Sequence, residues 1–134
     1  MGQQQLLLLV LAAIIVGAGV ILGVNMFQDN AAQANMDAVT QDVMTFAGKA
    51  QAWYRRPVAV GGGGQSFTTL DWSDIVSGAT GASYPNDNGT YAITTGTNTC
   101  TFVGTGKEDL GDPAGLLAVT AVVTGTAVNV TFTK

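Results

Sequence analysis

Few side chains in this sequence could do acid, nucleophilic or metal chemistry, and those few are scattered. No histidine is present, so neither a Ser-His nor a Cys-His nucleophile system can be built, and zinc lacks one of its usual ligands. Asp71 and Asp74 are three residues apart, which suits the cap of a short helical turn. The single cysteine, Cys100, cannot form an intramolecular disulfide, and we expect it to be buried in a strand. We therefore expect no catalytic residue and no enzyme.

Two stretches of oxygen-bearing side chains could offer ligands to calcium in an extracellular protein. One contains Asn86, Asp87 and Asn88, and the other contains Glu108, Asp109 and Asp112. Neither stretch has the spacing of a twelve-residue calcium loop. Because solvated turns explain both stretches, we expect no metal and no cofactor.

The overall composition favours a neutral, β-rich exterior. Five Lys and Arg residues stand against nine Asp and Glu residues, and the basic ones are scattered rather than clustered, so no nucleic-acid partner is expected. Fifteen of the seventeen threonines lie beyond residue 65. These threonines could carry O-linked sugars, and Asn88-Gly-Thr and Asn129-Val-Thr also fit the N-glycosylation pattern.

The longest apolar run begins directly after Gln3, Gln4 and Gln5 and extends from Leu6 to Val24. At about 1.5 Å per helical residue it spans roughly the 30 Å of a bilayer core, so it can cross a membrane once. No basic residue precedes it, unlike a secretory signal. It contains no ionisable side chain and the sequence has no second such run, so transport across the membrane is not expected.

Small residues within the apolar run could let another helix approach closely. Gly19 and Gly23 are four residues apart, as are Ala13 and Gly17, the small-xxx-small spacing of membrane helix pairs. The three glycines also lower helix propensity by about 1 kcal/mol each relative to alanine. Local unwinding outside lipid is therefore a second reading of the same residues.

The amphipathic stretch that follows must position a folded head. Val39, Val43, Phe46 and Trp53 recur at helical spacing and form one apolar face. The opposite face is expected to carry Asp37, Gln41, Asp42, Thr45 and Lys49. No proline interrupts Gln3 to Arg56, so we expect one continuous helix that Pro57 and the following glycines stop.

Three parts are therefore expected in one small α+β protein. A helix occupies residues 1–56, with 1–24 as the membrane or filament-core segment and 25–56 as the amphipathic part that packs on the head. A flexible Gly-rich joint occupies 57–65, and a β-rich head occupies 66–134.

A four-stranded antiparallel sheet is expected in the head. The clearest hairpin joins 116–124 to 127–133 across Gly125 and Thr126, and a second joins 91–95 to 99–104. Residues 66–70 read as a short strand, 71–78 as a helical turn capped by Asp71, and 84–90 and 107–115 as loops. The residues expected to meet the apolar face of the helix are Ile93, Cys100, Phe102, Val119, Val130 and Phe132.

A helix that is apolar all round and then amphipathic, joined to a small antiparallel sheet, resembles type IV pilins and the wider type IV filament superfamily. The local match includes Phe27-Gln28-Asp29, where pilins often show an aromatic-Gln-Asp sequence. The resemblance covers about the first fifty-five residues, and for the head it is architectural only. We expect Met1 to be the first residue of the processed chain, after removal of a leader, because this puts Gln5 at the family's glutamate position. The alternatives are cleavage after Gly2 and no processing by this route.

Two departures from the pilin pattern bear on assembly. The family usually has a glutamate where this chain has Gln5, and that carboxylate is thought to pair with the amino terminus of a neighbouring subunit. Gln5 can accept a hydrogen bond without bringing a charge into an apolar bundle. The helix-breaking proline that many bacterial pilins carry is also absent between Val20 and Val24. Assembly contacts are therefore expected from Met1, Gln3, Gln4 and Gln5, and close packing or unwinding from the small residues.

The expected function is that of a structural subunit, a major pilin, of an extracellular helical filament. Its expected partners are copies of itself, the inner membrane before assembly, and the pilus assembly machinery. The alternatives are a minor pilin or secretion pseudopilin, and a single-pass membrane-anchored module that binds a ligand outside the cytoplasm.

Overall fold

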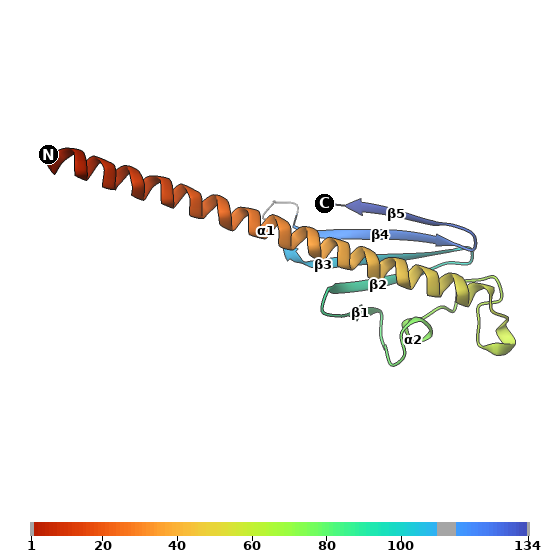
Figure 1. Cartoon of the computed structure of the whole chain (residues 1–134). Helices are drawn as coiled ribbons and strands as arrows, with labels where there is room; N and C mark the ends of the chain where they lie inside the picture. The colour runs from red at the N-terminus through yellow and green to blue at the C-terminus, as the bar shows by residue number, and fades with distance from the viewer. Residues whose placement is uncertain (1, 110–114, 134) are drawn as a thin grey trace.

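A long helix and an antiparallel sheet are the largest elements of the described part of the chain. The computed structural model describes residues 2–109 and 115–133. Helix α1 (Gly2–Arg55) runs without a break, and only its second half lies against the head (Figure 1). The predicted continuous helix is therefore confirmed. It ends at Arg55, just before Pro57 leaves the helical path.

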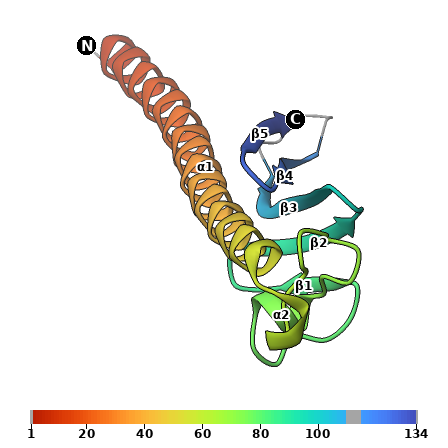
Figure 2. The same cartoon turned by 90° about the vertical axis from the view of Figure 1, so that its right-hand side faces the viewer.

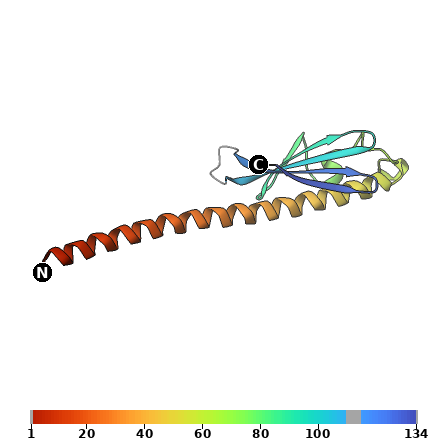
Figure 3. The same ribbon diagram turned by 90° about the horizontal axis from the view of Figure 1, so that it is seen from above.

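The sheet contains five strands rather than the four that were expected. They are β1 (Ser83–Pro85), β2 (Gly89–Thr95), β3 (Thr99–Asp109), β4 (Leu116–Thr124) and β5 (Val128–Thr133). They lie in sequence order and every neighbouring pair is antiparallel. The view in Figure 3 shows the helix along one face of this sheet. The α+β architecture is confirmed, with one additional edge strand.

Three assignments within the head are wrong, each for a local reason. The expected loop over residues 84–90 contains β1, because Ser83 to Pro85 pair with Ala92 to Thr90 in a short edge strand. Residues 107–109 continue β3, because Asp109 still pairs with Leu116. Residues 66–70 are not a strand, because Leu70 N–H bonds back to Phe67 in a turn. Part of the second expected loop lies outside the described residues.

The predicted helical turn after residue 70 is confirmed as α2 (Trp72–Ile75). Asp71 accepts a hydrogen bond from Trp72 N–H, and the Asp74 side chain accepts from Asp71 N–H in return. This reciprocal capping satisfies N–H groups that a four-residue helix cannot pair internally. The turn places the Trp72 indole in the core, with its ring centroid 5.3 Å from that of Phe46.

The glycine-rich segment, which was expected to be a flexible joint, folds back on the end of α1. A short 3₁₀ helix, η1 (Val58–Val60), is followed by Gly63, whose N–H bonds to the Trp53 carbonyl. A Cβ at Gly63 would collide with the Trp53 ring, so only glycine allows this approach. In Figure 2 α2 lies beside β1, below the end of α1.

The core lies between the second half of α1 and strands β3 and β4. Val39, Val43, Phe46 and Trp53 are buried there, facing Cys100, Phe102 and Val119. Ile93 and Val130 are partly buried at its margin. Phe132 was expected in the core, but 55% of it is exposed, because α1 packs on β3 and β4 and leaves this part of β5 uncovered.

Candidate functional site

The first half of α1 exposes apolar side chains all the way around. Its Leu, Ile and Val side chains from Leu6 to Val24 are between 51% and 70% exposed, and Phe27 is 80% exposed. No charged side chain occurs before Asp29. Monomeric soluble proteins rarely show an apolar surface of this extent. Among the described residues, one helix, α1, is both long enough and apolar enough to cross a membrane. It is therefore a candidate membrane anchor.

Polar side chains gather at the start of this apolar surface. Gln3, Gln4 and Gln5 are all exposed and helical, and Met1 lies outside the described residues. Their amides bond to no other side chain or backbone group in residues 2–109 and 115–133. The first turn of α1 contains no acidic residue, so the positive end of the helix dipole has no counter-charge of its own there.

The small residues leave open space beside the helix. Ala13 is exposed, and a Cβ added at Gly17, Gly19 or Gly23 would meet no atom within 4 Å. The helix remains regular through all of them, so the isolated chain shows no unwinding. The room beside these residues is therefore available to another helix.

Asp42 forms a polar tie between α1 and the head, although the sequence pattern places it on the exposed face of α1. Its Oδ2 accepts hydrogen bonds from Tyr91 Oη at 2.6 Å, Asn88 Nδ2 at 2.8 Å and Asn86 Nδ2 at 2.9 Å. Partial burial opposes ionisation of Asp42, but the three donors outweigh it and hold the pKa of the carboxyl below its ordinary value. Burial, reinforced by the Asp42 carboxylate, raises the pKa of Tyr91.

Asn35 makes a second tie between α1 and the same turn. Its Nδ2 donates to the Asn88 carbonyl at 2.7 Å, and its Oδ1 accepts from Lys107 N–H at 3.0 Å. Asn86 organises the turn from within, since its Oδ1 accepts from Asn88 N–H and Gly89 N–H. The Asn-Asp-Asn-Gly sequence was recognised as a turn. Its long-range partners on α1 could not be recognised, because contacts between residues more than forty positions apart leave no periodic signal.

These carboxylate and amide groups hold the 86–89 turn against α1. Asn86 and Asn88 direct their amide nitrogens at Asp42, and nitrogen donors of this kind do not ligate calcium. Across residues 2–109 and 115–133 no group of three His, Cys, Asp or Glu side chains is placed to hold an ion. Asp112, part of the second candidate stretch, lies outside those residues.

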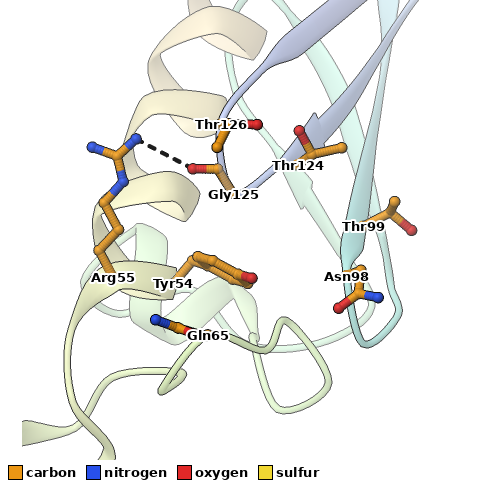
Figure 4. A pocket seen from close by; sticks show the side chains of 8 residues that line it. All are labelled: Tyr54, Arg55, Gln65, Asn98, Thr99, Thr124, Gly125 and Thr126. Atoms are coloured by element: carbon orange, nitrogen blue, oxygen red, sulfur yellow. Dashed lines mark hydrogen bonds between the residues drawn. The ribbon is translucent and has the colours of Figure 1, made fainter.

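A polar cavity of about 570 Å³ lies at the far end of the head, between the end of α1 and the β2–β3 and β4–β5 turns. It is lined by Tyr54, Arg55, Gln65, Asn98, Thr99, Thr124, Gly125 and Thr126. Figure 4 shows the Tyr54 ring in its floor, with the Arg55 guanidinium turned to the Gly125 carbonyl at 3.2 Å. The side chains of Gln65 and Asn98 have no hydrogen-bond partner among the described residues.

Cys100 is fully buried in β3, beneath α1. Burial raises the pKa of its thiol to about 12, so the reactive thiolate is scarce in the folded protein. This side chain fits a core position and supplies no nucleophile.

Comparisons of the chain with protein-family models, curated proteins and solved structures found no match.

Proposed function

We propose that this chain is a structural subunit, a major pilin, of an extracellular helical filament in which the apolar halves of α1 bundle together. The observation that carries the proposal is the contrast along α1. Its second half is covered by the sheet, while the first half projects from the head with its apolar side chains exposed on every side. A surface of this kind needs lipid or other apolar helices around it.

In the proposed assembly, the apolar half of α1 is surrounded first by lipid and then by the helices of other copies. The apolar half first lies in the inner membrane with the head outside the cytoplasm, and assembly machinery then transfers it to the filament core. Lipid tails and packed helices are similarly apolar, so the transfer gains little hydrophobic free energy. Close packing at Ala13, Gly17, Gly19 and Gly23 must favour the bundle, because small residues let backbones approach and add van der Waals contacts.

Gln5 supplies a polar contact inside this bundle. Its carbonyl oxygen can accept a hydrogen bond from the amino terminus of a neighbouring copy, and its amide can donate to backbone carbonyls. A neutral amide costs less to bury than a carboxylate, and it also attracts an ammonium group less strongly. In the proposed filament Gln5 therefore orients neighbouring copies more than it drives their association.

Electron microscopy of sheared cell-surface material tests the proposal. Filaments whose dominant protein is this chain by mass spectrometry are the expected result. Mass spectrometry of the same material identifies the native first residue and any methylation of it. The proposal fails if the cell surface carries no filament that contains the chain.

A single-pass anchored binding module is the second candidate, and the polar cavity at the end of the head favours it. A ligand could use the unpartnered amides of Gln65 and Asn98 there. In that case α1 would act only as a tether. Detergent extracts would then contain only monomer, and cells would form no filament containing the chain under any growth condition.

A further inference from the structure

Phe132 is an apolar side chain on the sheet face that packs against α1. The helix does not reach it, so it stays exposed. It pairs directly with Val119, so both side chains leave the same face, and Val119 lies in the core. Val128 and Val130 alternate with it along β5 on that face and are only partly buried. We call these three side chains, Val128, Val130 and Phe132, the β5 strip.

The free edge of β5 also lacks the features that usually protect a sheet edge. Natural edge strands carry charges, proline or bulges, or are very short. The opposite edge strand, β1, has three residues and ends in Pro85. In contrast, β5 has six residues, a regular register with β4, and no charged residue or proline between Val128 and Thr133. This edge is therefore suited to being covered in an assembly.

A second copy of α1 has the properties needed to cover the β5 strip. Residues 2–28 of α1 and residues 115–133 of the head contain no charged side chain, so the two surfaces match in charge. The C-terminal end of β5 also points along α1 toward its apolar half, in both Figure 1 and Figure 3. The strip is thus on the side of the head from which the exposed apolar helix emerges.

We infer that the β5 strip, whose most exposed member is Phe132, binds the Leu6–Val24 segment of a neighbouring copy. This inference rests on the proposed filament and names a specific contact within it. We propose Met44, which is 48% exposed, as the other side of this docking surface. It lies seven residues before Gln51, on the same side of α1, and Gln51 Nε2 donates to the Thr124 carbonyl where β4 ends.

The geometry also gives the stagger between the two copies. Phe132 pairs with Val119, Val119 pairs with Gly104, and Gly104 lies against Val39 and Val43, so Phe132 is level with about residue 41 of its own helix. The middle of the apolar segment is near residue 15, about 26 residues earlier. For parallel helices with a rise of 1.5 Å per residue, the docked copy is shifted by about 40 Å along the axis.

Photo-crosslinking within filaments tests this contact. A benzoylphenylalanine at position 132, mixed with wild-type copies, is expected to give a dimer whose crosslink maps to Leu6–Val24 of the other copy. The same group at position 131 is the matched control, because Thr131 is exposed on the opposite face of β5. A crosslink from 132 to a neighbouring β5 or to another head surface overturns the inference, as does equal crosslinking from 131 and 132.

Charge substitution gives an independent measurement. Phe132→Glu is expected to lower filament yield at least about tenfold, because each copy loses the burial of half a phenylalanine side chain and buries a charge. Thr131→Glu is expected to leave the yield nearly unchanged. Both monomers should still unfold cooperatively in detergent, with Phe132→Glu slightly below the wild-type temperature because the rest of its ring is buried within the chain. Unchanged filament yield for Phe132→Glu overturns the inference. If wild-type cells make no filament containing the chain, the proposed function fails instead, which is a distinct result.

Discussion

The two halves of α1 have the same backbone geometry and opposite surroundings. The second half buries one face against β3 and β4 and keeps polar residues on the other. The first half buries none of its apolar side chains within the chain. Helical structure alone therefore does not decide what a segment contacts. The distribution of apolar residues decides it, since one apolar stripe suits a sheet and an apolar circumference suits lipid or a bundle.

The largest effect expected from this contrast is on the stability of the head. Phe46→Ala removes a ring that packs against Trp72, Tyr91 and Phe102, and should lower the free energy of unfolding by about 3–5 kcal/mol. The measurement is alkylation of Cys100 in detergent-solubilised full-length protein, since this sole, buried thiol reacts only when the head opens. Leu9→Ala is the matched control and should leave the alkylation rate of the monomer unchanged. Equal rates for the two variants would remove the distinction between the halves.

A smaller loss is expected when the polar tie between α1 and the head is cut. Asp42→Ala leaves Tyr91, Asn86 and Asn88 without their shared acceptor and should lower the free energy of unfolding by about 2–3 kcal/mol. Asp37→Ala is the control on the exposed side of the helix, with a change within about 0.5 kcal/mol. Chemical denaturation of both variants decides whether Asp42 is part of the fold or only a surface carboxylate.

Acid should weaken the same tie progressively. The pKa of Asp42 is lower in the folded protein than its ordinary value of 3.8, so its carboxylate stabilises the fold above that value. This contribution is lost as pH falls from 3.8 through the folded pKa, because over that range the unfolded state takes up a proton that the folded state still refuses. Asp42→Asn should flatten the pH dependence of thermal unfolding between about pH 5 and pH 2. An unchanged slope in that variant would assign the acid sensitivity to other carboxylates.

The smallest effect is expected at the polar end of the apolar half. Gln5→Leu removes a hydrogen-bonding group worth about 1 kcal/mol and should reduce filament yield several-fold, without changing unfolding of the head. Gln3→Leu, at the first helical turn, is a useful comparison for a general loss of polarity. Quantified filament mass per cell is the measurement. An unchanged yield for Gln5→Leu would show that its polar side chain has no part in assembly.

Much of the fold could be predicted because patterns of apolar residues close in sequence indicate each element. The continuous apolar run, the later three-and-four spacing of Val39, Val43, Phe46 and Trp53, and the alternation along residues 116–133 each require one kind of element. Asp71 and Asp74 similarly indicated a capped turn, which α2 confirms. These signals depend on residues close in sequence, so they survive without knowledge of the tertiary structure.

The remaining features depend on how α1 crosses the sheet, which no local pattern encodes. Phe132 alternates correctly with Thr131 and Thr133, yet it is half exposed because the helix does not cover that end of β5. Asp42 falls at the edge of the buried face, where a small rotation decides whether it meets water or Tyr91. The short strand β1 was missed because Pro85 and the following asparagines are typical of a turn.

The unbroken course of α1 also has a mechanical consequence. With 54 residues and a rise of about 1.5 Å each, it is a rod of roughly 80 Å with no proline and no loop along its length. A pull on the head therefore passes directly along this rod to its first turn. The segment from Gly17 to Gly23 has the lowest helix propensity in the rod, so it is where stretching would begin. The head, tied to α1 through Asn35 and Asp42 above that segment, would stay folded while the rod lengthens.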